Sequence, residues 1–190
     1  MRVLCSETAD KSSRMFLTLS KANLLEQIKE DRGYHEVIPM IDHTILLRIF
    51  VDIDTFGDTP SIVLNKILSV LNERFETLSS DWAISSCNRD TKISYHIFSK
   101  KYCMQLVDLR DAMNTLKRNH PEIDTSVYWF DMNDHEDNGY FRLPNQTKNS
   151  INKPAPALKI ESGELADFLV TDVEGLVQCC AKVKYGEGHS

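Results

Sequence analysis

Apolar and polar residues alternate along two long stretches of the chain, and this period of two predicts strands with one buried face. Residues 45–54 place five aliphatic side chains on one face, while the other face ends with Asp52 and Asp54. The stretch "TKISYHIFS" turns three apolar side chains toward the predicted core and four residues to the opposite face: Lys92, Ser94, His96 and Phe98. Shorter strands are predicted in "WAISSCN", "SVYWF" and "YFRL".

Apolar positions three to four residues apart predict helices elsewhere in the chain. These predicted helices span about 19–29, 60–78, 102–117 and 173–183. Helices between pairs of strands predict a mixed fold of helices and strands, with a sheet that is covered by helices on at least one face.

The domain organisation follows from these elements. We expect one domain over residues 1–190, with its core motifs at 45–148. A shift of composition toward Asn, Lys, Pro and Ser predicts a connector at 149–163, and a C-terminal helix and tail at 164–190.

Composition narrows the class of protein. With 190 residues, 42% of them hydrophobic, the chain buries about two-thirds of its unfolded surface as a globular domain. No apolar run approaches the roughly 20 residues of a membrane span, and the N-terminus lacks the apolar stretch of a signal peptide, so we expect an intracellular protein with no membrane partner. The five cysteines have no zinc-site spacing, which favours free thiols.

The charge distribution is uneven. The net charge of −6 argues against a protein whose whole surface binds nucleic acid, but residues 86–101 carry four cations against one aspartate. Three of these cations, Arg89, Lys100 and Lys101, are candidates for a local template-binding patch. A solvated charged face explains the number of charges in residues 86–101 but not the alternation of polar and apolar residues there.

Asp52 and Asp54 are the first candidates for chemistry. Carboxylates at i and i+2 of a strand lie about 6.7 Å apart and can converge on two cations about 3.5–4 Å apart. Two-metal chemistry usually needs a third carboxylate, and Asp124, which precedes another apolar strand, is the natural candidate. Taken alone, Asp-x-Asp is more often a solvated strand end, and Asp124 alone would be a turn residue.

Lys92, Ser94 and His96 form the second candidate group. A cation, a hydroxyl and an imidazole in one short row suit the oxygens of a triphosphate. A single histidine in such a strand is more often a hydrogen-bonded core residue, so the row as a whole carries the prediction.

Together, "FVDID", "KISYH" and "EIDTSVY…YFRLPNQTK" resemble the three-motif signature of the archaeo-eukaryotic primase superfamily. The resemblance covers residues 48–148 and is strongest to the N-terminal primase domain of the poxvirus-type primase-helicases of large DNA viruses. It implies an α+β fold, with an RRM-like antiparallel sheet, flanking helices and an N-terminal αβ lobe. The activity it implies is template-directed nucleotidyl transfer with two Mg²⁺ or Mn²⁺ ions. The partners it implies are a single-stranded DNA template, NTPs or dNTPs and a replicative helicase, at replication sites in the cytoplasm or nucleus of a host cell.

The resemblance also implies roles for individual residues. The metal ligands would be Asp52, Asp54 and Asp124. The nucleotide would be held by Lys92, Ser94, His96, Arg142 and Lys148, of which the last two could also contact the template.

The chain departs from the family in several places. The run "WFDMNDHEDNG" before Arg142 is longer and more acidic than the family pattern and is predicted to be a hairpin tip. A cysteine-rich zinc element and a Walker A motif are missing, so we expect a catalytic fragment of a longer primase-helicase. Two other functions stay open: a non-catalytic module that binds single-stranded nucleic acid, and a metal-dependent nuclease.

Overall fold

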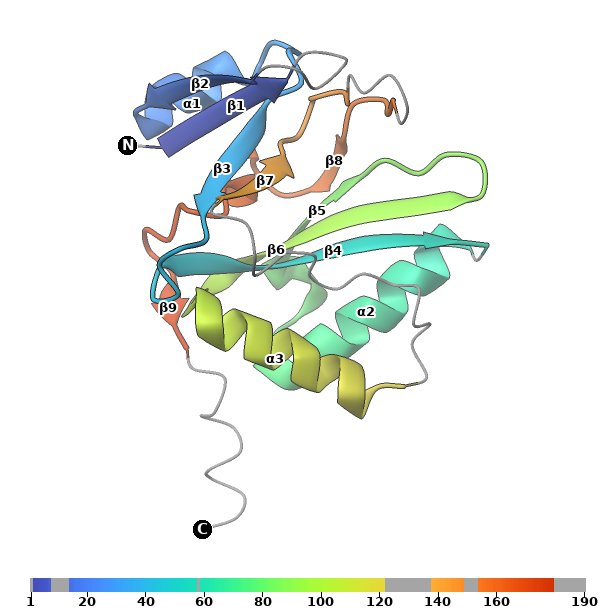
Figure 1. Ribbon diagram of the computed structural model, residues 1–190. Coiled ribbons are helices and arrows are strands. Elements are labelled where there is room, and N and C mark those ends of the chain that lie inside the picture. The colour runs from blue at the N-terminus through green and yellow to red at the C-terminus, as the bar shows by residue number, and fades with distance from the viewer. Residues whose placement is uncertain (1, 8–13, 58, 122–137, 149–153, 180–190) are drawn as a thin grey trace.

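Two β-sheets and three α-helices make up the part of the chain that the computed structural model describes, residues 2–7, 14–57, 59–121, 138–148 and 154–179 (Figure 1). All strand pairs are antiparallel except one short parallel pair. The predicted α+β class is therefore confirmed. Within these ranges, no helix is both long enough and apolar enough to cross a membrane.

The larger sheet has the strand order β4-β6-β5-β8, with β9 pairing in parallel with β6. Its strands are β4 (Leu46–Phe56), β5 (Trp82–Ser86), β6 (Lys92–Gln105), β8 (Lys159–Ser162) and β9 (Val177–Gln178). Because β4 and β5 are both antiparallel to β6, they run parallel to each other with β6 between them. Helix α2 (Pro60–Phe75) connects them, which makes a split β-α-β unit.

Helices α2 and α3 (Leu106–Asn119) cover one face of this sheet (Figure 1). Pro60 lies in the first turn of α2, where no backbone N–H is required, and the helix stops at Glu76, whose φ of 54° is left-handed. Apolar residues three to four positions apart, such as Val63 and Ile67, pack into the main hydrophobic core between helices and sheet. Neither of these two helices covers the opposite face of the sheet.

The smaller sheet has the order β2-β1-β3-β7 and lies over this opposite face (Figure 1). It consists of β1 (Arg2–Glu7), β2 (Arg14–Leu19), β3 (His35–Pro39) and β7 (Asn138–Arg142), with α1 (Lys21–Gln27) packed against it. The Ser20 side chain caps α1 by accepting a hydrogen bond from the backbone N–H of Asn23. This is the predicted N-terminal αβ lobe, but its edge strand β7 comes from the second half of the chain.

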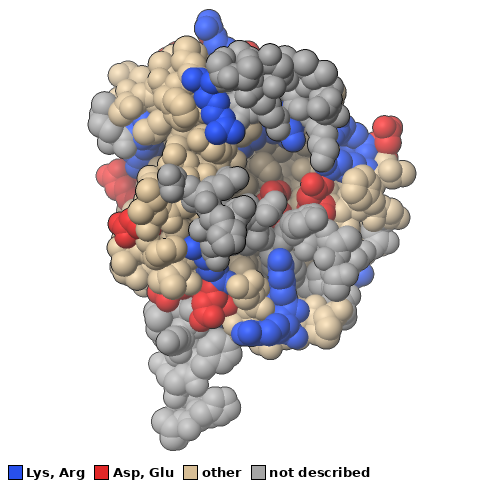
Figure 2. All heavy atoms as spheres, viewed as in Figure 1, with Lys and Arg blue, Asp and Glu red and all other residues tan. Residues whose placement is uncertain are grey.

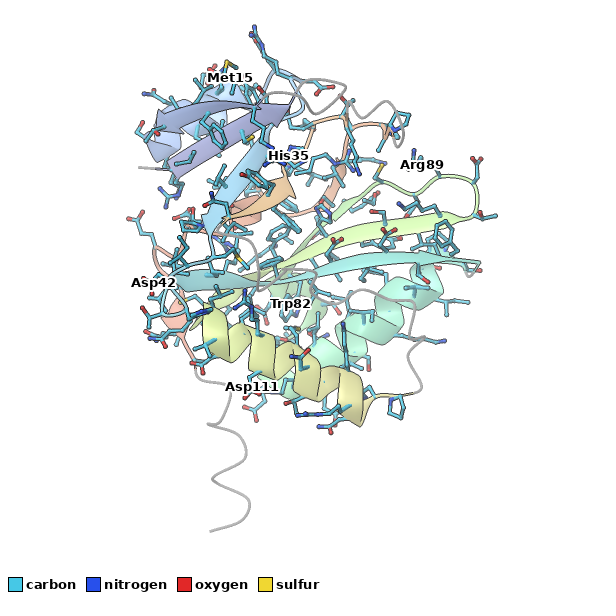
Figure 3. The ribbon with its side chains drawn as sticks, in the orientation of Figure 1. Met15, His35, Asp42, Trp82, Arg89 and Asp111 are labelled. Atoms are coloured by element: carbon cyan, nitrogen blue, oxygen red, sulfur yellow. The ribbon has the colours of Figure 1, made fainter. Side chains whose placement is uncertain are left out.

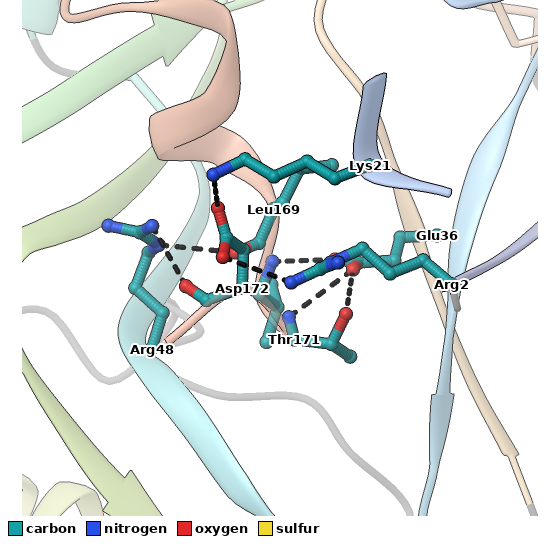
Figure 4. A network of polar contacts seen from close by, with 8 residues as sticks. Arg2, Lys21, Glu36, Arg48, Leu169, Thr171 and Asp172 are labelled. Carbon is teal, nitrogen blue, oxygen red and sulfur yellow. Dashed lines mark hydrogen bonds and ion pairs between the residues drawn. The ribbon is translucent and has the colours of Figure 1, made fainter. Parts of the chain in front are cut away.

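Residues 169–172, which we call the strap, join the two lobes through buried polar contacts (Figure 4). Glu36 of β3 is fully buried and accepts hydrogen bonds from the backbone N–H groups of Val170 and Thr171 and from the Thr171 hydroxyl. On the other side, the Arg48 guanidinium of β4 donates to the carbonyls of Leu169 and Asp172, and also to that of Ser99 in β6. The strap is therefore held to both sheets at once.

Charge balances this buried network. The Asp172 carboxylate lies 3.0 Å from Arg2 Nη2 and 2.7 Å from Lys21 Nζ, both in the smaller lobe. Burial raises the pKa of Glu36, although its three hydrogen bonds oppose the rise. Burial also lowers the pKa of Arg48, against the attraction of Asp167, Asp172 and Glu36.

Three predictions about the elements are wrong. Strand β6 continues to Gln105, so α3 begins at Leu106 and not at Tyr102, because residues 103–105 pair with β4. The predicted helix at 173–183 is not formed in its described part, where Val173 and Leu176 close a turn at Gly175 and β9 follows. The predicted connector at 149–163 contains β8, which extends the larger sheet.

Two predicted features lie outside the described residues, namely the strand "SVYWF" and most of the acidic loop that follows it. The other predicted elements are confirmed with modest changes of bounds: α1, α2, β4, β5 and β7.

Candidate functional site

Cross-strand pairing arranges the free face of the larger sheet in rows. On that face, Asp52 of β4 lies opposite His96 of β6, and Asp54 lies opposite Ser94. Directly opposite residues of an antiparallel pair share a face and have Cβ atoms about 4.5–5.5 Å apart. The two polar groups predicted separately from the sequence, Asp-x-Asp and the row of β6, are therefore direct neighbours.

A third row closes the polar surface. Next to the pair of Asp52 and His96, Phe50 lies opposite Phe98, with ring centroids 6.1 Å apart. Phe141 of β7 reaches across from the smaller sheet and packs edge-on against Phe50, with centroids 4.9 Å apart. The polar rows thus end at a cluster of aromatic rings, to which both lobes contribute.

A cavity of about 520 Å³ lies over these rows, between the two sheets. Eight of the eleven predicted site residues line it: Asp52, Asp54, Arg89, Lys92, Ser94, His96, Arg142 and Lys148. The smaller lobe contributes His35, Tyr140 and Phe141, and Figure 3 labels His35 on β3 and Arg89 beyond β5, on either side of the space. Segments distant in the sequence therefore form one site.

Each carboxylate has a cationic or imidazole group beside it. Asp52 Oδ1 lies 3.4 Å from His96 Nε2, and Asp54 Oδ1 lies 3.2 Å from Lys92 Nζ. The second contact has the distance of an ion pair but does not form a hydrogen bond. Both aspartates are partly exposed to the cavity, whereas only 9% of the His96 side chain is exposed.

His96 is held by aromatic packing as well. Its ring lies against Phe141, with centroids 4.3 Å apart and planes inclined by 37°, and Phe98 meets it edge-on at 6.4 Å. His96 is therefore buried like a core histidine and yet contributes to the cavity lining. The sequence alone could not combine the two descriptions, because Phe141 comes from 45 positions further along the chain.

The cavity is positive although the chain is acidic. Four cations line it against two carboxylates, Asp52 and Asp54, which gives +2 with the histidines neutral, whereas the whole chain carries −6. In Figure 2 acidic atoms lie within a recess of this face and basic side chains lie near its rim. Such a site favours a polyanion.

Backbone carbonyls orient two of the arginines. Arg142 donates from Nη1 to the carbonyls of Gln146 and Pro156, and Arg89 donates to the carbonyl of Pro154. Each contact uses part of a guanidinium that has five N–H groups, so donors remain for a ligand. The segment that the sequence predicted to be a connector thus forms part of the cavity rim.

Gln146 was not predicted to matter, yet it organises this rim. Its side chain is fully buried, and Oε1 accepts from the N–H groups of Arg32 and Tyr34. Its Nε2 donates to the carbonyls of Ile28 and Glu30. All four hydrogen bonds reach more than 100 positions back along the chain, so local sequence gives no signal for them.

Lys100 and Lys101 lie apart from the cavity. They occupy the irregular part of β6 where the register shifts between the pairs Phe50–Phe98 and Arg48–Cys103. The Ser99 hydroxyl accepts hydrogen bonds from the N–H groups of Lys101 and Tyr102 there. The two lysines are not among the lining residues, so they would contact a template only outside the cavity.

Two carboxylates of the cavity are candidate ligands for Mg²⁺ or Mn²⁺. Asp52 and Asp54 supply hard carboxylate oxygens on one face, which is the ligand type both ions prefer. The described residues contain no group of three or more His, Cys, Asp or Glu side chains placed to hold a metal ion. Asp124, predicted as the third ligand, lies outside them. The two aspartates thus fit the ions in ligand chemistry.

No model of a known protein family matches the chain, and a search of the curated proteins gives no match either. The function of the cavity therefore has to be inferred from its residues and their geometry.

Proposed function

We propose that this chain is the catalytic domain of a DNA primase, which makes primers on single-stranded DNA by template-directed nucleotidyl transfer. Its larger sheet supports this, because β4, α2, β5, β6 and α3 follow the order of an RRM-like core with helices on one face. That is the core which the resemblance to archaeo-eukaryotic primases implies.

One observation carries the proposal. The register of β4 and β6 puts the carboxylates of Asp52 and Asp54 directly beside the row of Lys92, Ser94 and His96, in one positive cavity. Nucleotidyl transfer needs both kinds of group, because the reaction joins a metal-activated hydroxyl to a triphosphate.

Asp52 and Asp54, with Asp124, would hold the divalent ions. When bound, such ions lower the pKa of the attacking 3′-hydroxyl and stabilise the leaving pyrophosphate. The chain's own cations act beside them, because Lys92, Arg142 and Lys148 supply positive charge where phosphate charge accumulates in the transition state. Ser94 and His96 donate hydrogen bonds to phosphate oxygens.

Ligand binding then exchanges partners within the site. In the ligand-free protein Lys92 Nζ lies 3.2 Å from Asp54 Oδ1, and His96 Nε2 lies 3.4 Å from Asp52 Oδ1. A nucleotide with its ions offers phosphate oxygens to Lys92 and His96 and positive charge to the aspartates. The same four side chains are thus paired before and after binding, so neither state leaves any of these four groups without a partner.

The two other functions fit less well. A non-catalytic binding module would place Asp52 and Asp54 against nucleic-acid phosphates, which they repel. A nuclease uses an acidic metal cluster but has no need for the row on β6.

The template would be contacted by three further cations. These are Arg89, Lys100 and Lys101.

The test is primer-free synthesis on a single-stranded DNA template with Mg²⁺, supplied with NTPs and dNTPs in separate reactions. Asp52→Asn and Asp54→Asn should each abolish synthesis while the melting temperature changes little, because both carboxylates are partly exposed and their contacts with His96 and Lys92 contribute little to stability. Asp111→Asn, the same change on an exposed position of α3, is the matched control and should keep activity. Full activity in either site variant would refute the metal assignment, and shortening of a labelled strand without synthesis would favour a nuclease.

A further inference from the structure

Two residues that are neighbours across the larger sheet each have a buried polar atom. Among the described residues, neither His96 Nδ1 nor the Ser85 hydroxyl has a hydrogen-bond partner. Ser85 is fully buried and His96 is 7% exposed. A buried polar group without a partner is destabilising, so two such groups next to each other call for an explanation.

The sheet places these two groups within reach of each other. Ser85 of β5 is the direct cross-strand partner of His96, which is in turn the partner of Asp52 on β4. The three side chains therefore form one row across the sheet face, with the histidine in the middle. Since the two ring nitrogens point roughly apart and Nε2 faces Asp52, Nδ1 is directed to the side of β5.

We propose that Ser85 is a positioning residue for His96, and that its hydroxyl donates a hydrogen bond to Nδ1. The movement required is a rotation about the Cα–Cβ bond of Ser85, the bond that sets the position of its hydroxyl oxygen. With Nδ1 accepting, the single proton of the neutral imidazole is on Nε2. The Nε2–H group then faces the cavity, where Asp52 Oδ1 lies 3.4 Å from Nε2 in the free protein, and it donates to a phosphate oxygen when a nucleotide is bound.

Packing makes this orientation effective. Phe141 lies against the His96 ring at 4.3 Å, so the ring has little freedom to turn, and the remaining uncertainty is which nitrogen carries the proton. Ser85 decides that. A row of aspartate, histidine and serine also occurs in hydrolases, but the Ser85 hydroxyl is fully buried and does not line the cavity, so it cannot act as a nucleophile here.

The first measurement is made on the ligand-free protein and does not depend on the proposed function. Nitrogen-15 NMR of the histidine rings reports which nitrogen carries the proton in the neutral form. We expect His96 to be protonated on Nε2 in the natural chain and to become a mixture of both forms in Ser85→Ala. Ser85→Thr, which retains the hydroxyl, should restore the Nε2 form.

Ser86→Ala is the matched control. Ser86 is the next residue of the same strand, points to the opposite face and bonds Glu161 at 2.6 Å. The control should lower the melting temperature through loss of that bond and leave the His96 proton on Nε2. An unchanged protonation pattern in Ser85→Ala, with an equal or higher melting temperature, would overturn the proposal, because removal of an unpartnered buried hydroxyl has this effect.

The second measurement rests on the proposed function. Titration with an NTP and Mg²⁺ should show about 2- to 13-fold weaker binding in Ser85→Ala, the range for one neutral hydrogen bond, and unchanged binding in Ser86→Ala. In the synthesis assay the KM for the nucleotide should rise while kcat stays close to its normal value. If the proton shifts in Ser85→Ala while the natural chain binds no nucleotide, the positioning role holds and the primase proposal fails.

Discussion

Replacing Gln146 with alanine tests whether one buried amide holds the cavity rim together. The substitution removes four hydrogen bonds of 2.8–3.1 Å and leaves two N–H groups and two carbonyls of residues 28–34 without their partner. At about 1 kcal/mol net for each bond, the free energy of unfolding should fall by roughly 4 kcal/mol. For a domain of this size that corresponds to a decrease in melting temperature of about 8–16 °C.

The assay is thermal and urea unfolding of matched variants. Gln27→Ala is the control, because it makes the same change in the same lobe but removes a single hydrogen bond, to the Tyr34 hydroxyl. It should be destabilised by only about 1 kcal/mol. Gln146→Glu keeps the acceptor for two N–H groups but turns an oxygen toward the carbonyls of Ile28 and Glu30, so it should be at least as unstable as Gln146→Ala. Equal stability of Gln146→Ala and Gln27→Ala would refute the reasoning.

Three further predictions address the nucleotide, the template and the strap. His96→Ala should weaken nucleotide binding by about 10- to 150-fold, because a charge-assisted hydrogen bond is lost, and template affinity should change much less. Unchanged nucleotide affinity with a lower melting temperature would make His96 purely structural. The affinity for single-stranded DNA should fall with salt concentration, at a log–log slope of roughly −2 to −3.5 for three to five phosphate contacts. Charge reversal of Lys100 and Lys101 together should flatten this slope without affecting nucleotide binding. The same slope in the double variant would place the template elsewhere on the surface. Since burial raises the pKa of Glu36 above the ordinary 4.5, its contribution to stability is complete below that value and is lost as the pH rises through the folded-state pKa. The melting temperature of Glu36→Gln, measured relative to the natural chain from pH 4 to 8, should therefore shift in favour of the variant as the pH rises, and a constant difference would contradict the raised pKa.

The candidate site was largely predictable because strand faces follow directly from alternation. A period of two puts Asp52 and Asp54 on one face and Ser94 and His96 on one face, whatever the rest of the chain does. Their adjacency was not predictable in the same way, since it depends on the register between two strands that are about 40 positions apart. The three-motif resemblance had grouped the residues without giving their geometry.

The supporting residues could not be predicted, because their partners are distant in the sequence. Glu36 and Arg48 are charged and would be taken as exposed, yet both are buried against a strap more than 120 positions away. The wrong helix at 173–183 has a similar cause. Its apolar spacing suits a helix, but Gly175 adopts a φ of 77° and the chain turns so that β9 can pair with β6.

The late return of β7 to the smaller sheet affects how the protein forms during synthesis. Strand β3 is complete at Pro39, but the strand that covers its edge begins only at Asn138, about 100 residues later. At about 5–20 residues per second, β3 leaves the ribosome with an unpaired edge for roughly 5–20 s. That edge includes Val37 and Ile38, which are buried in the finished fold, so it is open to pairing with another nascent chain. The helix-covered face of the larger sheet can begin to fold in this interval, whereas the cavity has no second wall until β7 arrives. The site therefore assembles late, and the rate of translation sets how long the edge of β3 stays unpaired.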